Sequence, residues 1–112
     1  MLEIIRGDDV ELEFVFTDDN GDPVDLTDGE IFFTVKKYVK DEDVILYKDF
    51  DFSGDGKDGV LSMWLEADET DLDIGVYSYD VQIKNKEGYI FSSEVGKLKV
   101  KRDVTIRTYI SV

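Results

Sequence analysis

Apolar residues recur at every second position along much of this chain. Val10, Leu12, Phe14 and Phe16, for example, occupy alternate positions, and Glu11 and Glu13 lie between them. A period of two is typical of β-strands that bury one face. The runs that we interpret as strands cover residues 2–5, 10–17, 31–35, 44–50, 61–65, 77–83, 89–95, 97–100 and 104–110. The pattern therefore predicts seven to nine short strands.

The segments between these runs are rich in Asp, Gly and Asn, which favour turns. The clearest are Asp18–Pro23, Asp51–Gly59 and Asn85–Gly88. Residues 67–74 have room for at most one short helical turn, and no linker or repeat divides the chain. We therefore expect one all-β domain over residues 1–112, built as an antiparallel sandwich or barrel.

The segment from Asp73 to Tyr77 favours the sandwich over the barrel. A glycine at position 75 allows a sharp entry into a strand, and Tyr77 follows two residues later. In a tyrosine corner, such a tyrosine returns its hydroxyl to the backbone a few residues upstream. The alternative is that Tyr77 is one more alternating aromatic residue. In both interpretations Gly75 and Tyr77 have structural roles.

The amino-acid composition excludes several kinds of chemistry. The chain has 112 residues, no His, no Cys, and 42% hydrophobic residues. Without His or Cys, a Ser/His triad, a thiolate nucleophile, a disulfide framework and the usual zinc sites are excluded. Carboxylates are abundant, but no pair is singled out, so we expect no enzymatic activity. The aromatic and hydrophobic content favours a folded chain over a disordered one.

Charge is strongly acidic and unevenly distributed. The 27 acidic and 13 basic residues give a net charge of -14, which opposes binding to nucleic acid or to an anionic membrane. Residues 1–83 hold six basic and 24 acidic residues, a net charge of -18, whereas residues 84–112 hold seven and three, a net charge of +4. The basic candidates for interaction are Lys97, Lys99, Lys101, Arg102 and Arg107. They pair either with acids of the same chain or with an acidic face of a neighbouring copy.

The motifs of this sequence resemble a known family. They are Val24–Thr27 (Val-Asp-Leu-Thr) after a turn with Gly and Pro, the strand Phe33–Lys36, and Gly75–Val81 (Gly-x-Tyr-x-Tyr-Asp-Val). In this order and spacing they resemble immunoglobulin-like domains of tailed-phage structural proteins. The chain is most similar to the N-terminal domain family named after the phage baseplate upper protein, from about Arg6 to Val100. The strand at 104–112 departs from that pattern; it either completes the sandwich or pairs with a neighbour.

The resemblance implies an antiparallel immunoglobulin-like β-sandwich that acts as a structural or attachment module. The expected partners are other tail or baseplate proteins, with a homo-oligomer as a further option. The start of the chain has neither a basic region nor a long apolar run, so we expect no signal peptide and synthesis in a cytoplasm. The resemblance implies that this is the host cytoplasm and that the final place of the protein is the virion. The alternative function is a carbohydrate- or receptor-binding module that calcium could stabilise.

Two further sets of residues are candidates for binding. Asp51, Ser53 and Asp55 precede Gly56 with the alternate spacing of half an EF-hand loop, and Asp58 could replace the missing twelfth ligand. An ordinary turn-rich loop is the alternative, and a similar cluster at Asp18–Asp22 has Pro23 in place of the glycine. Exposed aromatic residues are the second set, because Phe32, Trp64 and Tyr109 fall out of phase with the core positions of their strands. We expect no cofactor, and calcium in the loop of Asp51, Ser53, Asp55 and Asp58 is the one alternative.

Overall fold

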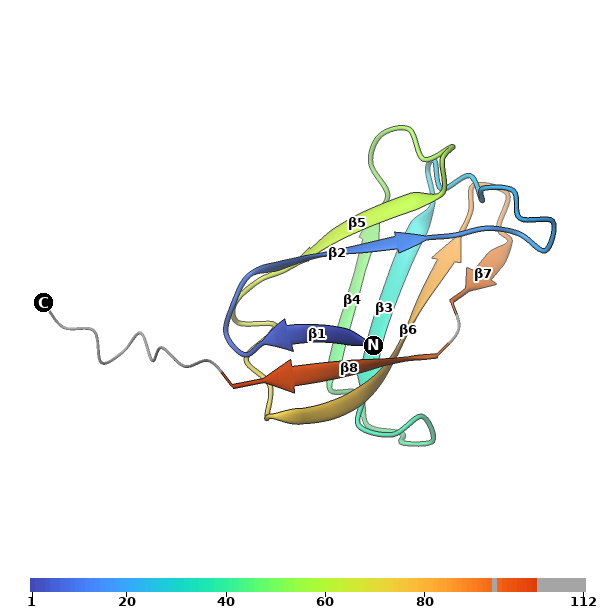
Figure 1. The fold of residues 1–112 in the computed structure, drawn as a ribbon. Helices are drawn as coiled ribbons and strands as arrows, with labels where there is room; N and C mark the ends of the chain where they lie inside the picture. Colours follow the sequence, from blue (N-terminus) through green and yellow to red (C-terminus); the bar gives the residue numbers. More distant parts are fainter. Residues whose placement is uncertain (94, 103–112) are drawn as a thin grey trace, which may run out of the picture.

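Eight β-strands form two sheets in the computed structural model, which describes residues 1–93 and 95–102 (Figure 1). The strands are β1 (Leu2–Ile5), β2 (Val10–Val15), β3 (Glu30–Lys36), β4 (Leu46–Asp51), β5 (Val60–Leu65), β6 (Gly75–Lys84), β7 (Ile90–Ser92) and β8 (Gly96–Lys101). No helix occurs within these described residues. The all-β prediction is therefore confirmed, with eight strands in the expected range.

The larger sheet has the strand order β1-β8-β6-β3-β4, and β7 also pairs with β6. The smaller sheet is the antiparallel pair β2–β5. Five of the six strand pairings in the described part of the chain are antiparallel, but β1 and β8 run parallel, from Leu2 opposite Leu98 to Ile5 opposite Lys101. The expectation of a wholly antiparallel fold is therefore wrong at this pair. A strand with alternating apolar residues buries one face whether its neighbour runs parallel or antiparallel to it. The pattern therefore does not determine the relative direction of two strands.

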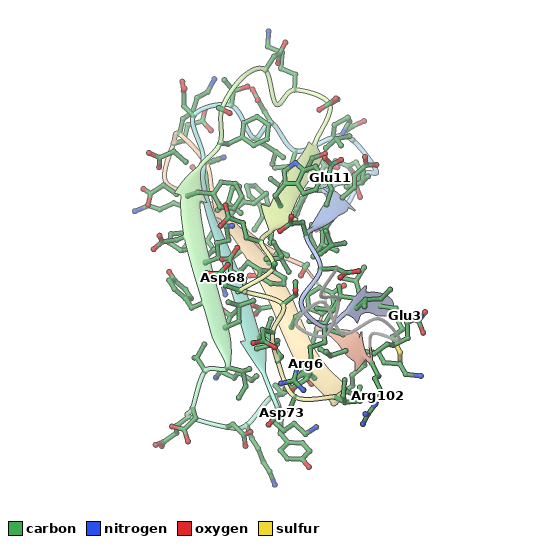
Figure 2. All side chains as sticks on the ribbon, turned by 90° about the vertical axis from the view of Figure 1, so that its left-hand side faces the viewer. Glu3, Arg6, Glu11, Asp68, Asp73 and Arg102 are labelled. Atoms are coloured by element: carbon green, nitrogen blue, oxygen red, sulfur yellow. The ribbon has the colours of Figure 1, made fainter. Side chains whose placement is uncertain are left out.

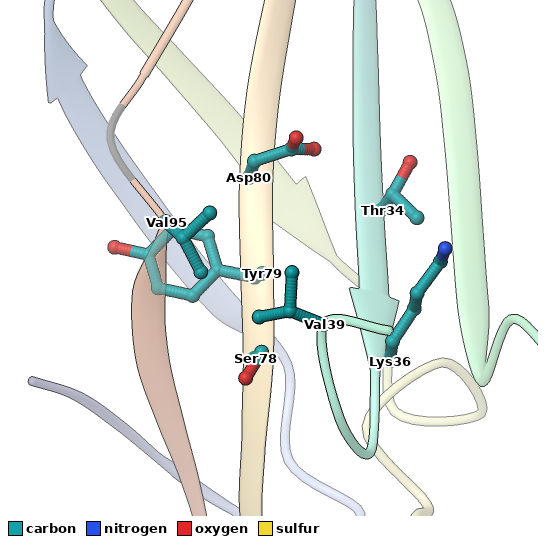
Figure 3. Close-up of a pocket in the computed structure, with 7 residues that line it drawn as sticks. All are labelled: Thr34, Lys36, Val39, Ser78, Tyr79, Asp80 and Val95. Atoms are coloured by element: carbon teal, nitrogen blue, oxygen red, sulfur yellow. The ribbon is translucent and has the colours of Figure 1, made fainter. Parts of the chain in front are cut away.

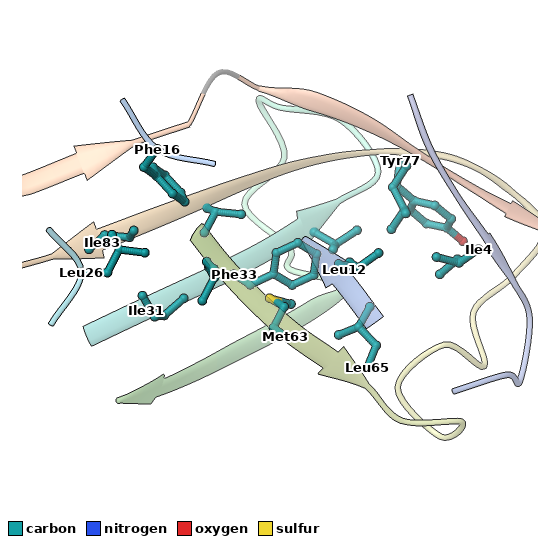
Figure 4. Close-up of a cluster of buried hydrophobic side chains, with 14 of the residues drawn as sticks. Ile4, Leu12, Phe16, Leu26, Ile31, Phe33, Met63, Leu65, Tyr77 and Ile83 are labelled. Atoms are coloured by element: carbon teal, nitrogen blue, oxygen red, sulfur yellow. The ribbon is translucent and has the colours of Figure 1, made fainter. Parts of the chain in front are cut away.

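The core lies between the two sheets and follows the alternating pattern. Phe33 of β3 is fully buried, and Leu12 of β2 and Met63 of β5 approach it from the smaller sheet (Figure 4). The rings of Phe14, Phe33 and Tyr79 pack with centroids 5.9 to 6.4 Å apart, so aromatic contacts join both sheets. Buried residues of both sheets belong to one cluster, which makes the arrangement a two-layer β structure.

The chain enters β6 through a hydrogen-bonded corner. The Tyr77 hydroxyl donates to the backbone carbonyl of Asp73 at 2.6 Å, and the Tyr77 side chain is buried. This contact is the one that a tyrosine corner makes. Burial, together with the nearby Asp73 carboxylate, raises the pKa of Tyr77, so the hydroxyl stays protonated and able to donate. Gly75 begins β6, opposite Val100 of β8.

The predicted elements differ from the structure in several segments. Residues 67–69 form a turn in which the Thr70 N–H donates to the Glu66 carbonyl, so one helical hydrogen bond forms but no helix follows. The strand expected over 89–95 is shorter, at Ile90–Ser92. The strand expected over 104–110 lies outside the described residues.

Candidate functional site

Three lysines form a row on the outward side of β8. Lys97 and Lys99 are exposed and Lys101 is half-buried, and they alternate with the buried residues Leu98 and Val100. This row, Lys97, Lys99 and Lys101, is called the lysine row below. The Lys97 ammonium donates to the Ser78 hydroxyl at 3.0 Å, and Lys101 pairs with Glu3 of β1 at 3.3 Å.

Lys97 and Lys99 of the lysine row form no ion pair with a described residue, and Glu3 of β1 lies across the strand pair from Lys99. The row's one ion pair among the described residues, Lys101 with Glu3, is about half exposed on both sides and contributes little to stability. Arg102 follows the row and is exposed, on the same side of the molecule as Glu3 (Figure 2). Arg107 lies outside the described residues. The lysine row is therefore a basic surface on an acidic protein.

Trp64 lies on the outward face of the small β2–β5 sheet with 57% of its surface exposed. Its cross-strand neighbour is Glu11, and Glu13 lies on the same face opposite Ser62. The predicted phase of β5 is therefore confirmed, because Leu61, Met63 and Leu65 are buried and Trp64 points outward. A large aromatic side chain between carboxylates on a solvent-facing sheet is a candidate contact with a partner.

An open hollow adjoins Trp64 at the end of β5. Asp9, Glu66 and Asp68 line it together with Trp64, and the side chains of Glu11 and Asp68 are labelled in Figure 2. Asp9 accepts a hydrogen bond from the Ala67 N–H at 2.7 Å, which connects the β1–β2 loop to the chain after β5. The set Asp9, Glu11, Glu13, Trp64, Glu66 and Asp68 is called the Trp64 face below. Its carboxylates form no ion pair with any residue that the structure describes.

Phe32 is less available for binding than Trp64. It lies on the outward side of β3, where it is half-buried between Asp49 of β4 and Gln82 of β6. Phe32 therefore presents only part of its surface to solvent. Tyr109 lies outside the described residues.

In the acidic glycine loop, Asp51–Gly59, two carboxylates form hydrogen bonds with nearby backbone groups. The Asp55 and Asp58 carboxylates accept hydrogen bonds from the backbone N–H groups of Lys57 and Val60, two residues downstream in each case. Such contacts are typical of Asx turns. Asp51 and Ser53 are both exposed.

The glycine of this loop has a packing role. Gly56 is buried, and a Cβ there would lie 2.7 Å from the Leu26 side chain and 2.8 Å from the Thr27 nitrogen. Its N–H donates to the Thr27 hydroxyl, and its carbonyl accepts from the Leu26 N–H. Close contact between backbones therefore accounts for a glycine at this position.

The structure does not gather the acids of either loop into a metal-binding cluster. Over residues 1–93 and 95–102, no group of three or more acidic side chains is placed to hold a metal ion. In the turn at Asp18–Asp22, the Asp18 carboxylate accepts from the N–H groups of Asn20 and Asp22, so it closes the turn.

The Val-Asp-Leu-Thr segment anchors the chain between β2 and β3. Val24 and Leu26 are buried, while the Asp25 carboxylate accepts from the Thr27 N–H at 3.0 Å. Hydrogen bonds from Thr27 lower the pKa of Asp25, with a smaller contribution from Lys86 at 3.9 Å. The Thr27 hydroxyl in turn binds Gly56. Each residue of the motif therefore has a packing or turn-forming role.

Thr70 and Lys48 have structural roles that the sequence did not indicate. Thr70 is fully buried, and its hydroxyl donates to the carbonyl of Asp8 at 2.8 Å. The Lys48 ammonium donates to the Trp64 carbonyl and pairs with Glu69 at 3.0 Å, so it links β4 to β5. No periodicity or motif distinguishes a threonine in a loop or a lysine on a strand, so no sequence signal was available.

A second hollow, of about 80 Å³, lies over β3 and β6 (Figure 3). Val39 and Val95 border it, and Thr34, Ser78 and Asp80 supply polar groups. Ligand pockets usually enclose about 300 Å³ or more, so this hollow is small for an organic ligand.

No protein-family model matches the sequence, and a search of curated proteins finds no match. Among the residues that the structure describes, none belongs to a helix with the length and apolar character needed to cross a membrane.

Proposed function

We propose that this chain is a non-enzymatic structural module of a phage tail or baseplate, with an immunoglobulin-like sandwich that docks on other virion proteins. The resemblance of its sequence motifs supplies the virion context. The strand arrangement is compatible with this proposal, because a β2–β5 pair packs against a sheet that contains β8, β6 and β3.

The observation that carries the docking role is the Trp64 face. Trp64 is 57% exposed on a sheet face whose other long side chains are carboxylates without an ion-pair partner in the described chain. Burial of an exposed aromatic ring at an interface contributes strongly to binding, and unpaired surface charge adds specificity for a partner of opposite charge.

Quantitative mass spectrometry of purified virions tests the proposed function. The phage that encodes this sequence is grown and its particles are purified by density gradient. We expect the chain in the particles at several copies each, in constant ratio to known tail proteins. Its presence in infected cells but absence from the particles would overturn the proposal.

A carbohydrate-binding module is the second candidate function, favoured by the hollow beside Trp64. An exposed indole can stack on a sugar ring, and the carboxylates of Glu66 and Asp68 could accept hydrogen bonds from hydroxyl groups. A glycan array tests it: binding that Trp64→Ala removes would support this role, and an array without any binder would remove it.

A further inference from the structure

The two surfaces of opposite charge on this chain have matching geometry. Glu11 and Glu13 occupy alternate outward positions on β2, and Lys97 and Lys99 occupy alternate outward positions on β8. Outward residues two apart on a strand are separated by roughly 6.5 Å, so both rows have the same charge spacing. One row could therefore meet the other in register.

The two surfaces do not neutralise each other within one molecule. Four ion pairs are present in the described part of the chain, and none joins the lysine row to the Trp64 face. Lys99 has no ion-pair partner among the described residues, and neither do Glu11 and Glu13. The complementary charges are therefore available to a second molecule.

Trp64 adds a component that does not depend on ion pairing. It is the cross-strand neighbour of Glu11, so a lysine that approaches Glu11 also approaches the indole ring. A lysine ammonium over a tryptophan face gains a cation–π interaction, and its aliphatic stem covers apolar surface. An acidic face with an exposed tryptophan is thus suited to lysine side chains.

We infer that the Trp64 face of one copy binds the lysine row of a second copy of this chain. The inference rests on the proposed function, for which it names a partner and a surface. Because the two surfaces belong to different sheets, each contact leaves one Trp64 face and one lysine row free. The contact can therefore repeat, as in the rings and tubes formed by heterologous interfaces.

Sedimentation velocity of the full chain tests the inference with charge reversals. At about 0.15 M salt the screening length is about 8 Å, so the overall repulsion between acidic copies is reduced while close pairs remain. We expect the wild type to associate with a Kd below about 1 mM. Glu11→Lys with Glu13→Lys, and separately Lys97→Glu with Lys99→Glu, should each remain monomeric.

Mixing the two double variants provides the decisive result. Each variant keeps one native surface, which is complementary to the native surface of the other variant. The two reversed surfaces are complementary to each other as well. The mixture should therefore associate, although neither variant does so alone.

Trp64→Ala should weaken wild-type association about tenfold. Glu42→Lys with Asp43→Lys makes the same charge change on the exposed β3–β4 loop and should associate as the wild type does. Unchanged unfolding midpoints confirm that the variants fold.

Three outcomes would overturn the inference: a wild type that remains monomeric at about 1 mM, undiminished association in either double variant, or a mixture that stays monomeric. A monomeric wild type that binds a different tail protein through Glu11 and Glu13 would also overturn it. That last result would leave the proposed function standing, because virion mass spectrometry tests that function separately.

Discussion

The hydroxyl of Tyr77 donates a 2.6 Å hydrogen bond to the backbone carbonyl of Asp73, four residues earlier. This bond ties the start of β6 to the segment that follows β5, so it links the large sheet to the chain leaving the small one. Without this acceptor, the buried Tyr77 hydroxyl would have no hydrogen-bond partner, which costs free energy. The backbone between Asp73 and β6 would also lose a contact that fixes its course.

Tyr77→Phe should lower the free energy of unfolding by about 1 to 2 kcal/mol, because the ring remains but the hydrogen bond is lost. Urea denaturation followed by tryptophan fluorescence measures the change. Tyr47→Phe is the matched control, since the exposed Tyr47 hydroxyl donates a hydrogen bond to the Asp49 side chain at 3.2 Å and to no other residue in the described part of the chain. Equal stability of the two variants would contradict the structural role of the corner.

Thr70→Val should be destabilising although it keeps the shape of the side chain. The buried Thr70 hydroxyl lies within hydrogen-bond distance of the carbonyls of Asp8 and Ala67. Valine has no hydroxyl, so both carbonyls would lose this donor. We expect a loss of about 1 to 3 kcal/mol, measured by thermal or urea unfolding. Thr17→Val at an exposed position is the control and should change stability little.

Glu69 should make the protein sensitive to acid. Burial would raise the pKa of Glu69, but hydrogen bonds from the Glu66 N–H and the Lys48 ammonium outweigh it and lower the pKa. A pKa that is lower in the folded state gives stability that is present at neutral pH. This contribution is lost as the pH falls below the ordinary glutamate range and through the folded pKa.

The comparison of wild type with Glu69→Gln across pH tests this linkage. At pH 7 the variant should be less stable by about 1 kcal/mol, and the difference should shrink toward about pH 3. Glu42→Gln, in an exposed loop, should match the wild type throughout. A stability difference for Glu69→Gln that does not change with pH would argue against the linkage.

Gly56→Ala distinguishes the packing role of the acidic glycine loop from a calcium role. The added Cβ would collide with Leu26 and the Thr27 backbone, so the unfolding midpoint should fall, with a loss of about 1 to 3 kcal/mol. We expect the loss to be the same in calcium and in chelator, and the wild-type midpoint to be equal in both. A wild-type midpoint that rises with calcium would instead support a bound ion.

The period-two pattern predicted most of the strands and their buried faces, because a strand with one buried face repeats every two residues. It also placed Trp64 on the outside, since its neighbours Met63 and Leu65 fill the core. The parallel pairing of β1 with β8 could not be predicted, because it depends on how distant segments meet and not on local alternation.

The acidic glycine loop shows where local spacing misleads. Its Asp and Gly positions are typical of a calcium loop, but turn formation and close packing against Leu26 use the same residue types. The hydrogen bond from the buried Thr70 hydroxyl to the Asp8 carbonyl joins residues 62 positions apart. Only the folded arrangement defines such contacts.

Electron cryomicroscopy of particles of the phage that encodes this chain tests whether the chain is a structural part of the virion. We expect density for several copies of this β-sandwich in the tail or baseplate, each in contact with another virion protein. A reconstruction in which other proteins account for all tail and baseplate density, with no copy of this chain in the particle, would contradict it.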